Sequence, residues 1–99
     1  MPVIEIREAV AFVKFMAELR DTRAKAKIVG RIERLAYGHE GDVGPVGEGV
    51  SELRVHFGPG YRVYFKRRGQ VVIVLLCGGD KKSQDRDIKL AKKMAAELE

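Results

Sequence analysis

The stretch that decides the fold is "SELRVHFGPGYRVYFKRRGQVVIVLLC", residues 51–77. Apolar and polar side chains alternate over Ser51–Phe57 and again over Tyr61–Lys66, which is the pattern of half-buried β-strands. The "GPG" at 58–60 predicts a tight turn between these strands, and Arg68-Gly69 predicts a second turn. Val71–Cys77 is apolar throughout, as expected for a central strand covered on both faces. The stretch therefore predicts a three-stranded meander.

The segments on either side predict helices. Apolar residues recur at helical spacing over Arg7–Arg20, and a second helix follows, with Asp21 or Thr22 as its N-cap and Gly38 at its end. A last helix is expected over Gln84–Leu98, and "PVIEI" near the start predicts a short strand. The glycine-rich "GHEGDVGPVGEG", residues 38–49, is expected to be a loop. The predicted order is β-α-α-β-β-β-α, an α+β fold in which an antiparallel sheet packs on a helical hairpin and a C-terminal helix follows.

Length and composition predict one soluble globular domain over residues 1–99, since 45% of the residues are hydrophobic and 33% are charged. Glu5 and Glu8 lie where a signal peptide needs apolar residues, and the longest apolar run is too short to span a bilayer. Cys77 stands alone within that run, so we expect a core residue in a reducing, cytoplasmic environment.

Positive charge is concentrated in one part of the sequence. Between Arg54 and Lys82 there are seven Lys or Arg and one acid, Asp80, whereas the rest of the chain holds 12 basic and 13 acidic residues. A concentrated basic segment in an otherwise balanced chain indicates a polyanionic partner, most commonly a nucleic acid. A merely solubilising surface would spread its charge more widely.

The alternation also predicts which side chains share a face of the sheet. Leu53, Val55 and Phe57, with Tyr61, Val63 and Phe65, should pack on the helical hairpin. The opposite face should gather Arg54, His56, Arg62, Tyr64 and Lys66 with almost no acid, which is an arrangement suited to phosphate.

These residue types suit the cleavage of RNA by its own 2′-hydroxyl group. Arg62 and Arg54 can stabilise charge on phosphate, and His56 supplies an imidazole, the side-chain type whose unperturbed pKa in model peptides is close to neutrality. Tyr64 can stack on a base or transfer a proton. Further RNA contacts are expected from Lys66, Arg67, Arg68, Lys81 and Lys82. The two histidines lack neighbours at metal-ligand spacing, so we expect neither a metal nor another cofactor.

Two blocks, "DVGPVGEGVSELRVHFGPGYRVYF" and "LLCGGDKKSQDRDI", resemble the addiction-module killer proteins of the RelE/HigB superfamily, in particular the phage-derived group related to HigB. The resemblance covers almost the whole chain and implies the toxin of a bacterial type II toxin–antitoxin module. Such toxins typically cut mRNA in the ribosomal A site without a metal. A cognate antitoxin blocks them and often helps to repress their operon, so operator DNA would be reached only through the antitoxin, and no membrane is implied.

The resemblance also assigns individual residues. Arg62 matches the phosphate-stabilising arginine of the G-Y-R strand motif in RelE-like ribonucleases. Arg54, Lys81 and Lys82 lie where those toxins carry further cations. The tyrosine in the last helix of RelE falls near Ile88 here, so the roles of His56 and Tyr64 come from strand geometry alone. Two other functions stay open: a DNA gyrase inhibitor like the ParE toxins, and a degenerate toxin that keeps only antitoxin and operator binding.

Overall fold

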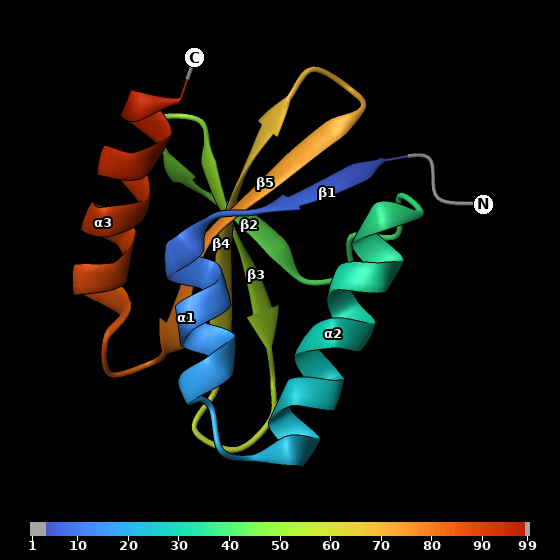
Figure 1. Cartoon of the computed structure of the whole chain (residues 1–99), viewed down its shortest axis with the longest axis vertical. Helices are drawn as coiled ribbons and strands as arrows, with labels where there is room; N and C mark the ends of the chain where they lie inside the picture. Colours follow the sequence, from blue (N-terminus) through green and yellow to red (C-terminus); the bar gives the residue numbers. More distant parts are fainter. Residues whose placement is uncertain (1–3, 99) are drawn as a thin grey trace.

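Five strands and three helices make up the computed structural model of the chain, which describes residues 4–98. In chain order they are β1 (Glu5–Glu8), α1 (Val10–Glu18), α2 (Thr22–Ala36), β2 (Val43–Gly47), β3 (Val50–Val55), β4 (Tyr61–Arg68), β5 (Val72–Asp80) and α3 (Gln84–Glu97). The predicted α+β class is confirmed, and Figure 1 shows the helices arranged around one twisted sheet.

The five strands form one sheet in the order β1-β5-β4-β3-β2. The meander of β3, β4 and β5 is antiparallel, and β5 lies between β1 and β4, so its predicted central position is confirmed. The expectation of a wholly antiparallel sheet is wrong, because β1 runs parallel to β5 with Glu5 opposite Val72. The sequence pattern of β1 marks a strand but carries nothing that selects its partner or direction. Part of the predicted first strand, residues 2 and 3, lies outside the described residues.

The glycine-rich segment is not only a loop, and here the prediction is wrong. Residues Val43–Gly47 form β2, an edge strand that pairs with β3 and places Val43 opposite Leu53. Pro45 is tolerated there because an edge strand need not donate every backbone hydrogen bond. Gly47, Glu48 and Gly49 all have positive φ and form the turn into β3. The five glycines of the segment are typical of a loop, and only Val43 and Val46 have side chains typical of a strand. The sequence therefore did not predict β2.

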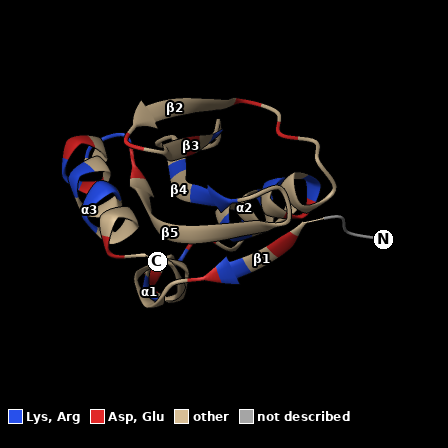
Figure 2. Ribbon diagram, turned by 90° about the horizontal axis from the view of Figure 1, so that it is seen from above, with Lys and Arg blue, Asp and Glu red and all other residues tan. Residues whose placement is uncertain are grey.

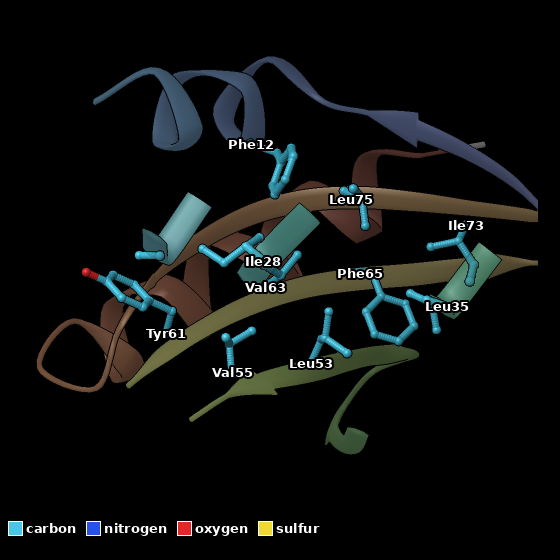
Figure 3. Close-up of a cluster of buried hydrophobic side chains, with 11 residues drawn as sticks. Phe12, Ile28, Leu35, Leu53, Val55, Tyr61, Val63, Phe65, Ile73 and Leu75 are labelled. Carbon is cyan, nitrogen blue, oxygen red and sulfur yellow. The ribbon is translucent and has the colours of Figure 1, made fainter. Parts of the chain in front are cut away.

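The helical hairpin covers one face of the sheet, as predicted. Asp21 caps α2 by accepting hydrogen bonds from the backbone amides of Arg23 and Ala24, and Gly38 ends this region with φ of +88°. Figure 3 shows the core beneath the hairpin. It consists of Phe12, Ala24, Ile28, Leu35, Leu53, Val55, Tyr61, Val63, Phe65, Ile73 and Leu75. These residues include every member of the predicted apolar face except Phe57, which packs on the cluster while remaining partly exposed.

The helix α3 covers part of the opposite face, where a second cluster is made of Val50, Tyr64, Val74, Leu76, Cys77, Ala91 and Ala95. Figures 1 and 2 show α3 and α2 on opposite sides of the sheet. Cys77 is buried here as predicted, and its pKa is raised to about 12 by burial. Gly79 lets α3 approach closely, because a Cβ at this position would lie 1.9 Å from Oδ2 of Asp87.

Candidate functional site

Two predicted arginines lie side by side at the ends of the meander strands. The register of β3 and β4 places Arg54 directly opposite Arg62, on the face of the sheet that α3 only partly covers. Two guanidinium groups in this position repel each other unless an anion lies between them.

The anion between them is Glu52, a nearly buried carboxylate whose side chain is 6% exposed. Its Oε1 accepts a hydrogen bond from Nε of Arg62 at 3.1 Å, and its Oε2 accepts one from Nε of Arg54 at 3.1 Å. Glu52 thus holds both guanidinium groups in fixed positions and neutralises part of their charge. Glu52 was not among the predicted site residues. Strand alternation puts it on the same face as Arg54, and an acid on a predicted basic face is the signal that could have identified it.

A second carboxylate reaches the site from the residue before β2. Oδ1 of Asp42 accepts a hydrogen bond from Nη1 of Arg54 at 2.7 Å, and Oδ2 of Asp42 contacts Nε2 of His56. The hydrogen bonds with His56 and then with Arg54 hold the pKa of Asp42 below its ordinary value. Asp42 therefore orients an imidazole that is itself 74% exposed to solvent. Sequence reasoning missed Asp42 because it lay in the segment expected to be a loop.

These side chains surround a hollow of about 290 Å³ at the β3–β4 turn, which we term the β3–β4 hollow. Its lining includes Arg54, His56, Tyr61, Arg62 and Lys81, together with the turn at 58–60. Four of the predicted site residues therefore meet in one place although they come from three different parts of the chain. The arrangement combines fixed cations, an accessible imidazole and a carboxylate beside that imidazole.

The structure corrects the expected position of Tyr64. Its side chain is fully buried beneath α3, and burial, more than the nearby carboxylates, raises its pKa well above the ordinary value. The hydroxyl group has no hydrogen-bond partner among the residues that the structure describes. The alternation correctly predicted which face Tyr64 occupies but could not predict that a helix covers that face. A buried ring cannot stack on a base.

Lys66 also differs from the expected arrangement. Its Nζ donates a hydrogen bond to the backbone carbonyl of Ala95 at 3.1 Å, close to the end of α3. This ammonium group therefore stabilises the helix end, and it lies away from the β3–β4 hollow.

The remaining predicted cations are spread over the molecule. Arg67 forms a salt bridge with Glu40 and lies 5.4 Å from the ring of Phe65, on the hairpin side of the sheet. Arg68 is exposed at the end of β4, about 20 Å along the strand from Arg62. Lys82 is exposed and lines a separate hollow between α1 and the start of α3. Figure 2 shows basic residues distributed over β1, β4, α2 and α3 rather than gathered on one surface.

Within residues 4–98 no group of three or more His, Cys, Asp or Glu side chains is placed to hold a metal ion. None of the described helices has the length and hydrophobicity required to cross a membrane.

Comparison with known proteins identifies the relatives of the chain. A protein of Haemophilus influenzae, named only as an uncharacterized protein, is 50% identical over 95 residues, which are 96% of this chain and 96% of that protein. Residues 10–97 match the family described as "phage derived protein Gp49-like". This match extends from the first residue of α1 to the last residue of α3 and includes every residue of the β3–β4 hollow. The chain is a member of the Gp49-like family of phage-derived proteins.

Proposed function

We propose that this protein is the toxin of a type II toxin–antitoxin module and that it arrests translation by cutting ribosome-associated mRNA. The observation that carries the proposal is the β3–β4 hollow, where Arg54, Arg62 and Lys81 meet the exposed imidazole of His56. The two sequence blocks that resemble RelE/HigB toxins supply β2 and β3, most of β4 and β5, and the start of α3. Membership of a phage-derived family agrees with the phage-derived group to which the resemblance points.

The proposed chemistry uses the ribose next to the scissile bond as the nucleophile. His56, oriented by Asp42, removes the proton of the 2′-hydroxyl group, and the 2′-oxygen forms a bond to phosphorus. The bond from phosphorus to the 5′-oxygen breaks, and that oxygen takes a proton from Lys81 or from water. The products are a 2′,3′-cyclic phosphate and a free 5′-hydroxyl group.

The arginines supply the charge stabilisation that this reaction needs. Negative charge develops on the phosphate oxygens as the 2′-oxygen attacks, and Arg62 and Arg54 are positioned for it before the substrate arrives, because Glu52 already holds them. Prior positioning of donors lowers the barrier, since no reorganisation is required during the reaction. The proposed reaction uses no metal and no other cofactor.

RNA beyond the scissile bond is proposed to contact the exposed cations Arg68, Lys81 and Lys82. Lys66 and Arg67, also predicted as RNA contacts, have partners within the protein, so we assign them a smaller share of the binding. The proposed macromolecular partners are the ribosome with its mRNA and a cognate antitoxin, through which alone operator DNA would be reached.

A second candidate is a gyrase-directed toxin similar to ParE. It is favoured by the burial of Tyr64, which removes one proton-transfer group from the exposed face, and by the neutralisation of both arginines by acids. A gyrase inhibitor needs a surface that is complementary to gyrase, and it needs no proton-transfer groups.

Induced expression in bacteria separates the candidates. Primer extension on cellular mRNA should reveal cuts at fixed positions within codons soon after induction, and these cuts should disappear when translation initiation is blocked. Intact mRNA together with DNA damage would assign the protein to gyrase instead. Growth without arrest and without either signal would leave a degenerate toxin.

A further inference from the structure

The outer surface of α2 carries basic side chains that have no acidic partner. Within residues 4–98, Arg23, Lys27 and Arg34 form no salt bridge. Arg31 is different, since its guanidinium group donates to the backbone carbonyls of Arg54, Glu40 and Asp42 and so ties α2 to the sheet. The unpaired charge of the described protein is therefore prominent on α2, whereas the arginines of the β3–β4 hollow are paired.

This arrangement is unfavourable for an isolated helix. Arg23 lies in the first turn of α2, where a positive charge opposes the helix dipole, and the N-cap carboxylate of Asp21 offsets only part of this effect. Arg23 and Lys27 are four residues apart and repel each other. A bound anionic group would relieve both effects.

A groove runs along this surface, which we term the α2 groove. It has a volume of about 740 Å³ and is lined on α2 by Arg23, Ala26, Lys27, Gly30 and Arg34. Phe57, just after β3, and the largely buried Val55 complete the lining. The lining thus combines apolar groups with a row of cations. A second hollow of about 490 Å³ continues past Gly30 and Arg34 toward Tyr37, whose side chain is 48% exposed.

Gly30 is an independent indication that something approaches this surface. A glycine in the interior of a helix lowers its stability relative to alanine. Apart from the adjoining backbone of α2 itself, no atom of residues 4–98 lies within 4 Å of the position that a Cβ would take, so packing against the rest of the described protein does not require a glycine here. Gly30 is also shared by both hollows. Its missing side chain leaves the backbone of α2 open to close contact from outside.

We propose that the α2 groove binds an acidic, amphipathic polypeptide segment of another protein. Acidic side chains would pair with Arg23, Lys27 and Arg34, while apolar side chains would cover Ala26 and the partly exposed Phe57. The 15 residues of α2 span about 22 Å, which is enough for roughly four turns of a bound helix or a short extended segment.

The apolar lining favours polypeptide over nucleic acid as the occupant. A phosphate backbone gains nothing from Ala26, and Nζ of Lys27 already lies 5.8 Å from the ring centroid of Phe57, on one face of the ring where a base would stack. An acidic peptide uses both the cations and the apolar groups.

A segment bound in the α2 groove would also affect the β3–β4 hollow. His56 lines both the α2 groove and the β3–β4 hollow, so a segment in the groove lies against the imidazole proposed to act as the base. This consequence, unlike the binding itself, rests on the proposed function: the bound segment would hinder RNA from entering the hollow.

The test is a selection of random 12-residue peptides displayed on phage against the full chain, followed by fluorescence-polarisation measurement of the selected peptides. We expect the enriched peptides to combine Asp or Glu with apolar residues. Lys27→Glu should raise their Kd at least tenfold, whereas Lys89→Glu, the same charge change on the exposed surface of α3, should leave it within twofold. Gly30→Ala should raise both the Tm of the protein and the Kd of the peptides.

Several results would overturn the proposal: no enrichment, enriched peptides without acidic residues, or equal effects of Lys27→Glu and Lys89→Glu. Gly30→Ala with unchanged affinity would also contradict it. Single-stranded RNA that competes with the peptides and loses affinity in Lys27→Glu but not in Lys89→Glu would assign the groove to nucleic acid. Arg62→Ala should leave the peptide Kd unchanged, so a failure of the RNA-cleavage proposal remains distinguishable from a failure of this one.

Discussion

At the scale of single residues, Glu52 determines what the two arginines of the β3–β4 hollow can do. It accepts a hydrogen bond from each of them while its own side chain is nearly buried. Without this carboxylate, Arg54 and Arg62 would face each other across neighbouring strands with only Asp42 close to one of them. The sequence predicted both arginines correctly as neighbours, because strand alternation and a short turn determine that. It did not predict their neutralisation, because a single acid on a basic face has no periodicity to reveal its role.

The first prediction concerns this arrangement. Glu52→Gln should lower the free energy of unfolding by about 3 kcal/mol, since it leaves the largely buried guanidinium group of Arg62 without a carboxylate and that of Arg54 with Asp42 alone. The double variant Glu52→Gln/Arg62→Gln should lose clearly less than the sum of the two single variants, with a coupling of about 1 kcal/mol or more. Urea unfolding of the four proteins measures this, and strictly additive losses would show that the pair is not coupled.

A second prediction concerns the buried hydroxyl group of Tyr64. Because it lacks a partner among the described residues, Tyr64→Phe should raise the free energy of unfolding by roughly 1 kcal/mol at neutral pH. Tyr37→Phe, at an exposed position, is the matched control and should change nothing. Loss of mRNA cleavage in a stably folded Tyr64→Phe variant would instead show that Tyr64 takes part in the reaction.

The same residue predicts a dependence on alkaline pH. The pKa of Tyr64 is raised in the folded protein, so above its unfolded pKa of about 10 the unfolded chain loses protons that the folded chain retains, and stability falls as pH rises. Burial raises the pKa of Cys77 to about 12, so the stability of the wild type and of Tyr64→Phe should begin to fall near pH 9. Above about pH 10, Tyr64→Phe should lose stability less steeply than the wild type.

At the scale of elements, β2 is the strand that the sequence did not predict. It follows Asp42, the carboxylate that completes the site. The strong patterns of β3, β4, β5 and the three helices were predictable from periodicity and from the capping residue Asp21. Five glycines and a proline in residues 38–49 instead indicated a loop, although pairing with β3 stabilises an edge strand there. The covering of Tyr64 by α3 was equally unpredictable, since strand alternation assigns a face but not what packs on it.

The third prediction tests the contribution of β2. A Cβ at Gly44 would lie 2.6 Å from Nη2 of Arg54, the movable end of a flexible side chain. Gly44→Ala should therefore displace this guanidinium group while changing the free energy of unfolding by less than about 1 kcal/mol. If Arg54 stabilises the reacting phosphate, cleavage should slow by about tenfold, as small displacements of catalytic groups do. An unchanged rate in single-turnover cleavage would remove Arg54 from the mechanism.

At the scale of the whole molecule, the positive charge is less concentrated than its position in the sequence suggests. Of the seven basic residues between Arg54 and Lys82, three arginines are paired with acids in the fold, and Lys66 donates to a backbone carbonyl. Counting charges along the chain could not reveal this, because Glu40, Asp42 and Glu52 come from outside the counted segment. The same count also hid the positive charge of α2, because acidic residues elsewhere in the chain cancel that charge in the sum.

The fourth prediction follows from that pairing. Binding of a single-stranded RNA, made resistant to cleavage by 2′-O-methyl groups, should weaken with salt at a slope of log K against log[salt] near −2, as expected for about three phosphate contacts. Arg68, Lys81 and Lys82 are the expected contacts. A slope near −5 would mean that all seven basic side chains of the segment are available to RNA, contrary to the pairing seen in the fold.

The most direct test of the central claim is single-turnover cleavage of mRNA on programmed ribosomes by Arg62→Ala. Arg62 lines the β3–β4 hollow and is held by Glu52, so its loss should slow cleavage by about 10²-fold or more while ribosome binding changes much less. Arg7→Ala, the same substitution at an exposed position on β1, should cut at the wild-type rate. Cleavage by Arg62→Ala at the wild-type rate would contradict the assignment of the hollow as the site where mRNA is cut.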